Sequence, residues 1–102
     1  MCIATEIVTM KSAEGIAKEE FICIVDRVEN SFHSKQPGFI DTELIYDETS
    51  GLWIMIQHWE SVEQLKAASD KMLKDSAAET FVKSLHPESV KMTIASQIKR
   101  WK

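Results

Sequence analysis

The segment that most constrains the fold is residues 37–61, which the sequence predicts to be a β-hairpin. Residues 39–47 and 52–59 are rich in β-branched and aromatic side chains, and a polar stretch suited to a turn separates them. Pro37-Gly38 marks where the hairpin begins. Alternate side chains of a strand point to opposite faces. Both faces of the second strand are largely apolar: one carries Leu52, Ile54, Ile56 and His58, and the other carries Trp53, Met55, Gln57 and Trp59.

A strand with two apolar faces needs cover on both sides. An antiparallel strand with one solvated face would show polar residues on that face, and residues 52–59 do not. A chain of 102 residues is short for a sheet with two covering layers. We therefore expect a second copy of the chain to cover one face. A central strand beneath the helices and loops of a monomer is the alternative that the pattern leaves open.

The composition fits one folded domain spanning residues 1–102. Hydrophobic residues make up 44% and charged residues 27%, so no disordered tract is expected. The net charge of -4 argues against nucleic acid as a partner, because phosphate binding needs concentrated positive charge. No export signal or membrane-spanning stretch is evident, so we expect a cytoplasmic protein. Cys2 and Cys23 have neither disulfide nor zinc spacing and are expected to be reduced thiols, with Cys23 buried.

The remaining segments predict two more strands and three helices. Strands are expected over residues 2–10 and from Val90 to about residue 99, and helices over about 16–34 and 61–74. A short third helix is expected to be stopped by His86-Pro87, with His86 as its end residue, because proline disfavours helical geometry in the residue before it. Capping boxes are predicted for the second and third helices, Ser61 with Gln64 and Ser76 with Glu79.

The element order β-α-β-β-α-α-β predicts an α+β fold. Right-handed crossovers arrange these elements most simply as a four-stranded antiparallel sheet with helices on one face, a ferredoxin-like plait. The apolar face that this arrangement leaves open would be covered in a homodimer.

Few residues of the chain suggest chemistry. The sequence contains no glycine-rich phosphate loop, no metal-ligand spacing and no nucleophile elbow, so neither a cofactor nor a metal is expected. His58 is the strongest candidate among the three histidines. Asp41 and Glu43 are predicted to share a strand face with Phe39 and Ile45, where they form either a proton-sharing pair, a solvated face or dimer salt bridges.

The face with Trp53 and Trp59 also carries Met55 and Gln57. Two large aromatic surfaces with a soft sulfur and an amide suit a flat aromatic ligand. Plain core packing beneath the helices explains the same residues equally well.

Two motifs, Pro37-Gly38-Phe39 and Trp59-Glu60-Ser61 at the start of a capped helix, resemble the antibiotic biosynthesis monooxygenase family. The resemblance extends from the helix before Gln36 to Phe81. It implies dimers of ferredoxin-like subunits whose sheets join into an α+β barrel, with a pocket between sheet and helices. The family includes cofactor-independent oxygenases of anthrone-like polyketides, quinol oxidases, heme-degrading enzymes and proteins that handle signalling molecules.

The resemblance carries over residue by residue only in part. Trp59 matches a pocket tryptophan of the anthrone-oxidising branch, whereas the asparagine and tyrosine of that branch correspond to Met55 and Leu65. The heme-degrading branch has an asparagine on the first strand, which residues 2–10 lack, and Ala68 and Ala78 lie where its aromatic and histidine residues would align. Heme degradation is therefore disfavoured.

The resemblance supports a cofactor-independent monooxygenase or quinol-type oxidase of a small aromatic or polyketide-like substrate. Its pocket would desolvate a phenol or anthrone and stabilise the anion that reacts with O₂. The predicted catalytic residues are Trp59, His58 and Gln57, and the predicted substrate-binding residues are Trp53, Met55, Leu65 and Phe81. The alternatives are a non-catalytic dimer that binds a small hydrophobic metabolite, and a structural interaction module.

Overall fold

The computed structural model describes residues 2–102, which form a four-stranded antiparallel sheet in the order β2-β3-β1-β4. The strands are β1 (Ala4–Met10), β2 (Phe39–Asp47), β3 (Leu52–Trp59) and β4 (Lys91–Ser96). The helices are α1 (Lys18–Ser31), α2 (Val62–Met72) and α3 (Ser76–Lys83), with short 3₁₀ turns η1 (His33–Lys35) and η2 (Pro87–Ser89).

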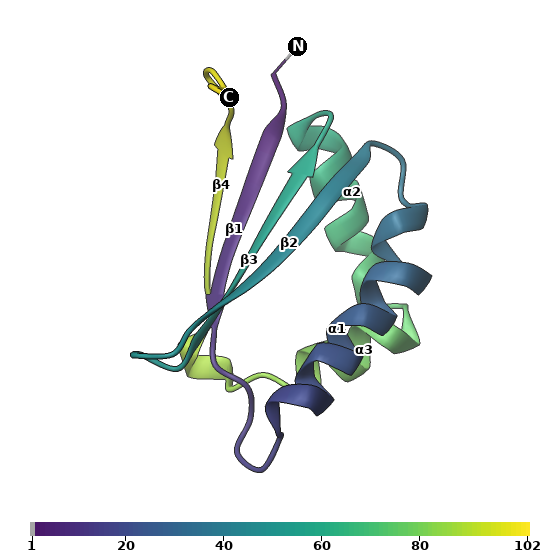
Figure 1. The fold of residues 1–102 in the computed structure, drawn as a ribbon. Coiled ribbons are helices and arrows are strands. Elements are labelled where there is room, and N and C mark those ends of the chain that lie inside the picture. The colour runs from purple at the N-terminus through teal and green to yellow at the C-terminus, as the bar shows by residue number, and fades with distance from the viewer. Residues whose placement is uncertain (1) are drawn as a thin grey trace.

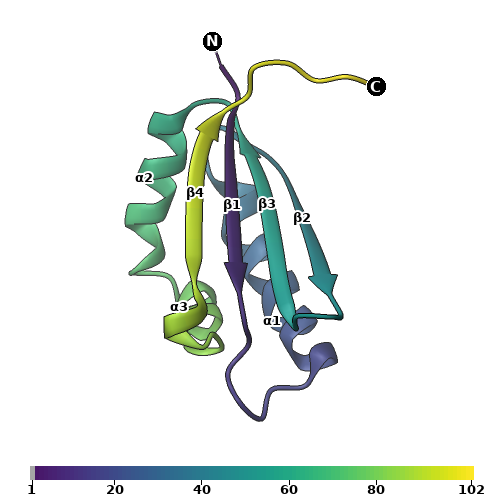
Figure 2. The same cartoon turned by 90° about the vertical axis from the view of Figure 1, so that its left-hand side faces the viewer.

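The helices lie on one side of the sheet, and its other side is open (Figure 1). Figure 2 looks onto the open side, where no helix crosses in front of the strands. The predicted α+β plait is therefore confirmed. No helix in the described part of the chain is long and apolar enough to cross a membrane.

The hairpin of β2 and β3 has the predicted bounds because its turn is locally encoded. The Asp47 carboxylate accepts hydrogen bonds from the Thr49 backbone N–H at 2.9 Å and the Ser50 hydroxyl at 2.8 Å. The Gly51 N–H closes the turn on the Asp47 carbonyl at 2.8 Å. Gly51 has φ +76°, a conformation that side chains other than glycine rarely adopt.

Because of a β-bulge near the start of β2, the set of residues predicted for one face of this strand is wrong. The pairing with β3 shifts between Phe39 and Asp41, so the alternation of faces changes there. Phe39 turns toward the helices and packs edge-on against Trp59, with ring centroids 5.4 Å apart. Asp41 instead lies on the open side of the sheet, where one carboxylate oxygen is 2.7 Å from His58 Nδ1. Phe39 therefore does not share a face with Asp41 and Glu43.

The helix ends agree with the predictions at one N-terminus and differ at another. Ser61 caps α2, since its hydroxyl accepts the Gln64 N–H at 3.2 Å. The capping box predicted for Ser76 is wrong, because Asp75 caps α3 by accepting the Ala78 N–H at 2.9 Å. Asp75 has the extended backbone that an N-cap residue adopts, whereas Ser76 is already helical.

Three other predictions of local structure need correction. Cys23 is exposed on α1 rather than buried. Helix α3 ends at Lys83, so His86 lies beyond it, where its N–H donates to the Lys11 carbonyl at 2.8 Å. The last strand stops at Ser96, because its pairing with β1 ends at Ala4 and leaves Ile98 outside the sheet.

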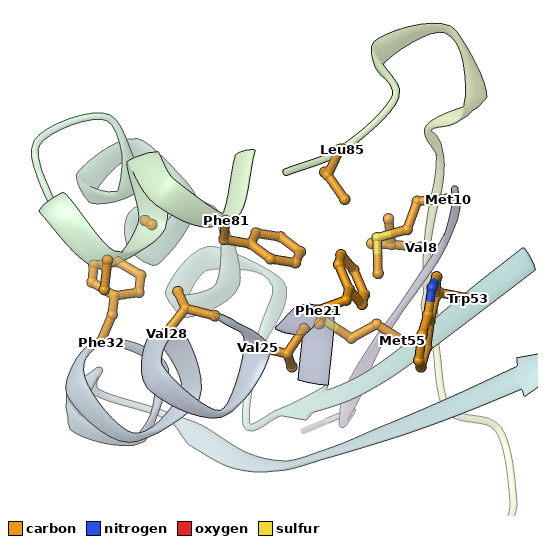
Figure 3. Close-up of a cluster of buried hydrophobic side chains, with 12 residues drawn as sticks. Val8, Met10, Phe21, Val25, Val28, Phe32, Trp53, Met55, Phe81 and Leu85 are labelled. Carbon is orange, nitrogen blue, oxygen red and sulfur yellow. The ribbon is translucent and has the colours of Figure 1, made fainter. Parts of the chain in front are cut away.

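The main hydrophobic core joins the sheet to α1 and α3 (Figure 3). The Phe21 ring lies between Trp53 and Phe81, with centroids at 4.8 and 6.2 Å. Trp53 also packs against Tyr46 at 4.5 Å, so two aromatic rings contact Trp53. A second, smaller cluster joins β1 and β3 to α2 and consists of Ala4, Trp59, Leu65 and Ala68.

The two faces of β3 are buried to different degrees. Side chains alternate between buried and partly buried along the strand, and the buried ones face the helices. The partly buried set, Leu52, Ile54, Ile56 and His58, lies on the open side with Ile7 and Ile45, which are 38% and 42% exposed. The single chain therefore covers one face of its sheet, and a covering second copy stays a prediction.

Candidate functional site

A cavity of about 590 Å³ lies between the helix-facing side of the sheet and helices α2 and α3. Its walls are mostly apolar and come from both hydrophobic clusters: Val8, Met55, Leu65, Ala68, Phe81 and Leu85. Pockets that bind small organic ligands typically have volumes of about 300–1,000 Å³. The cavity is therefore large enough for a compact aromatic molecule.

One end of the cavity is polar and ordered by a chain of hydrogen bonds. The Trp59 indole Nε1–H donates to Gln57 Oε1 at 3.2 Å, and Gln57 Nε2 donates to Glu29 Oε1 at 3.3 Å. The other carboxylate oxygen of Glu29 is bonded to Nδ1 of His33. This network links β3 to α1 and η1, and it fixes the orientation of the Gln57 amide, which is 1% exposed.

Glu6 brings a carboxyl group to the same end. It lies on β1 directly across from Gln57 of β3, lines the cavity and is 8% exposed. Burial raises the pKa of Glu6 and the neighbouring Glu29 adds to the shift, whereas His33 opposes it. No hydrogen-bond partner of the Glu6 carboxyl is found within residues 2–102, and its oxygens are not among the fully buried atoms that lack a partner, so they keep exposed surface.

The mouth of the cavity is bordered by exposed apolar side chains and one ion pair. Leu73, Val82 and Met92 are 89%, 56% and 58% exposed. Glu79 and Lys83 of α3 form an ion pair at 2.8 Å at this rim. A ligand entering from solvent would thus pass an apolar rim before it reaches the polar end.

The structure brings together five of the seven predicted site residues. Met55, Gln57, Trp59, Leu65 and Phe81 line the cavity. Trp53 lies in the main core among other rings and does not line the cavity. His58 points to the open side of the sheet, because neighbouring residues of a strand face opposite ways, and it is hydrogen-bonded there to Asp41.

Three residues at the polar end were not predicted from the sequence: Glu6 and His33, which line the cavity, and Glu29, which does not line it but is hydrogen-bonded to Gln57 and His33. Glu6 could have been found, because it is the one charged residue on a strand face that otherwise carries Ala4, Val8 and Met10. Glu29 near the end of α1 and His33 in η1 are four residues apart, a spacing that brings side chains together in helical structure. Within residues 2–102, no group of three or more His, Cys, Asp or Glu residues is arranged to hold a metal ion.

Comparison with protein families gives one match. The sequence model of the family described as antibiotic biosynthesis monooxygenase matches residues 4–83. The match contains β1, the hairpin, α1 and α2, and all but the last few residues that line the cavity. No curated protein matches the sequence closely enough to count as a relative.

Solved structures with the same fold share little sequence with the chain. SnoaB, a cofactor-independent oxygenase from Streptomyces nogalater, is 17% identical with a TM-score of 0.67, over 100% of this chain and 97% of that one. PA3566 from Pseudomonas aeruginosa is 20% identical with a TM-score of 0.66, over 97% of each chain. A candidate antibiotic biosynthesis monooxygenase from Bordetella bronchiseptica is 12% identical with a TM-score of 0.79, over 97% of this chain and 100% of that one. At these identities the likeness shows the fold alone.

Proposed function

The chain belongs to the antibiotic biosynthesis monooxygenase family, and from this we propose that it is a cofactor-independent oxygenase of a small aromatic substrate, such as an anthrone or a quinol. The observation that carries the proposal is the cavity beside Trp59, which combines apolar walls with a polar end made by Gln57, Glu6 and His33. SnoaB, which has the same fold, is a cofactor-independent oxygenase.

The proposed reaction depends on forming a substrate anion away from water. For an anthrone, O₂ converts the ring methylene to a ketone, and the second oxygen atom leaves as water. The ionised substrate supplies the electrons for this reaction. Apolar walls exclude water from the ring, and a hydrogen-bond donor near its oxygen stabilises the anion.

Gln57 is the donor that the geometry favours. Its amide nitrogen carries two hydrogens, and one is directed to Glu29 Oε1. Within residues 2–102 the other faces only the thioether sulfur of Met55, a weak acceptor 3.9 Å away. A substrate oxygen beside Trp59 would be a better acceptor for that hydrogen. Trp59 itself supplies the aromatic wall.

We also propose that two chains associate through the open side of the sheet. Ile7, Ile45, Ile54 and Ile56 lie on that side, and no helix in the part of the chain that the structure describes covers them. Contiguous apolar surface of this kind is typical of interfaces. Light scattering should give the mass of two chains, and the mass of one chain at micromolar concentration would contradict the dimer.

A second candidate function is binding of a hydrophobic metabolite without turnover. Met55 and Leu65 favour this function, because they are apolar at two positions where the family resemblance predicts polar residues. The two functions share the cavity and differ only in oxygen consumption.

The experiment that tests the proposal fills the cavity with one added side chain. Ala68 lines the cavity at 3% exposure, whereas its neighbour Ala67 is exposed on the same helix. Oxygen uptake is measured with dithranol, anthrone and a set of quinols, and ligand binding is measured by thermal shift.

The matched variants Ala68→Leu and Ala67→Leu give a direct comparison. We expect uptake with the wild type and Ala67→Leu, and loss of uptake with a folded Ala68→Leu. Binding without uptake would support the metabolite binder instead. Equal uptake by the two variants, or neither binding nor uptake by the wild type, would refute the cavity as the site.

A further inference from the structure

We infer that Glu6 is the acid–base residue of the cavity, and that its carboxylate accepts the proton of a bound, uncharged aromatic alcohol or anthrone. The inference rests on the oxygenase function proposed above and names the group that ionises the substrate. It also specifies the substrate class, since the ligand has to enter without charge and carry an acidic proton at its inner end.

The position of Glu6 is set by the sheet. On β1 it lies between Ala4 and Val8 on the helix-facing side, and its partners in register are Gln57 of β3 and Ile94 of β4. Glu6 and Gln57 therefore stand side by side at the polar end of the cavity. A substrate oxygen that accepts from Gln57 would lie within reach of the Glu6 carboxyl.

The Glu6 carboxyl can accept a hydrogen bond from a ligand. Buried carboxyl groups in proteins are normally hydrogen-bonded, because desolvation without a partner is costly. Within residues 2–102 the Glu6 oxygens have no hydrogen-bond partner, while Glu29 nearby is bonded to both Gln57 and His33. Glu6 is thus the carboxyl at this site whose lone pairs are available to a hydroxyl group in the cavity.

The surrounding charges favour Glu6 as a base. Burial raises its pKa first, Glu29 of α1 adds to this, and His33 of η1 opposes it. Helix α3 places only the paired Glu79 and Lys83 at the rim, and the lining residues from α2 and β4 are uncharged. A raised pKa brings the carboxyl closer in acidity to a phenolic or anthrone proton, which makes proton transfer easier.

The proton transfer itself keeps the charge balance of the cavity. The O–H or C–H bond of the substrate breaks, its electron pair stays on the substrate, and the proton goes to a Glu6 oxygen. The negative charge moves from Glu6 to the substrate, so the apolar walls do not have to accommodate a second charge. An aromatic carboxylate would instead place its anion beside Glu6 and Glu29, and is expected to be rejected.

The test uses Glu6→Gln, which keeps the shape of the side chain and removes its titration. Glu19→Gln, on the exposed surface of α1, is the matched control. With dithranol, wild-type kcat/KM is expected to rise with pH through a pKa above the ordinary carboxyl range. Glu6→Gln should lose that rise together with about a hundredfold of the rate, the lower range for general base catalysis. Glu19→Gln should keep both.

A second readout does not need turnover. Binding of para-nitrophenol to the wild type should weaken on the acid side as Glu6 takes up its proton, and on the alkaline side as the phenol ionises. With Glu6→Gln, binding should weaken only on the alkaline side. Para-nitrobenzoate should bind the wild type more weakly than para-nitrophenol does.

The outcomes separate the two proposals. If para-nitrophenol binding to the wild type weakens on both the acid and the alkaline side but no oxygen is taken up, the oxygenase is rejected and Glu6 is kept as the proton acceptor. Three results would overturn the role of Glu6. The first is oxygen uptake by Glu6→Gln with an unchanged pH profile, and the second is binding to that variant that still weakens on both the acid and the alkaline side. The third is no binding of para-nitrophenol.

Discussion

Replacing Gly38 by alanine tests how the hairpin is joined to helix α2. Gly38 has φ +85°, and its carbonyl accepts the Glu60 N–H at 2.7 Å, which ties the start of the hairpin to its end. A Cβ at this position would lie 2.4 Å from Gln64 Oε1, 2.5 Å from Gln64 Cδ and 2.8 Å from Gln64 Cβ. The amide end could rotate away, but Gln64 Cβ is fixed to the helix.

The expected loss of unfolding free energy in Gly38→Ala has two contributions. A left-handed backbone costs a residue other than glycine about 1–2 kcal/mol. Overpacking adds about 1–3 kcal/mol, because the start of α2 has to shift and the Ser61–Gln64 contact of 3.0 Å is disturbed. Gly38→Ala should therefore lower the free energy of unfolding by about 2–5 kcal/mol, the sum of the two ranges.

Gly15 supplies the matched control. It has φ +88°, and a Cβ there would meet no atom within 4 Å. Gly15→Ala should thus show only the backbone cost of about 1–2 kcal/mol. Urea unfolding of both variants gives the two free energies, provided that the slopes of the transitions agree. Equal destabilisation of the two variants would refute the steric argument for Gly38.

Three further predictions concern a helix cap, a buried carboxyl and the thiols. Asp75→Ala should lose about 1 kcal/mol of stability with the cap of α3, whereas Ser76→Ala should lose much less, and equal losses in urea unfolding would contradict the observed cap. Because burial raises the pKa of Glu6, ionisation of this carboxyl opposes folding, and the stability present at low pH is lost as pH rises through the folded-state pKa. Glu6→Gln should therefore melt higher than the wild type at alkaline pH, and this difference should shrink below the ordinary carboxyl pKa of about 4.3; a difference independent of pH would count against a buried titrating group. Cys2 and Cys23 are exposed, so both should react with a thiol reagent in the folded protein as readily as in urea, and protection of one thiol would contradict that exposure.

The hairpin and the topology could be predicted from the sequence because their signals are local and strong. β-branched and aromatic runs around Asp47 and Gly51 give both strands their observed bounds. The order of elements then leaves few antiparallel arrangements with helices on one face. The cavity wall around Trp59 follows from the same alternation, combined with the family resemblance.

The polar end of the cavity could not be predicted in full, because it depends on register and on backbone detail. Glu6 meets Gln57 only through the pairing of β1 with β3, which no local pattern specifies. His58 was expected at the site, although its neighbours Gln57 and Trp59 face the other way. The bulge that turns Phe39 inward has no distinct signal in the sequence.

The indole N–H signals of the three tryptophans give the most direct measurement of the central claim, that an aromatic ligand binds in the cavity against Trp59. Trp59 lines the cavity, Trp53 lies in the main core and Trp101 is 77% exposed. Titration with dithranol, followed by NMR under exclusion of oxygen, should shift the Trp59 signal strongly and leave the Trp101 signal unmoved. A Trp59 signal that stays in place while the ligand binds would contradict the account.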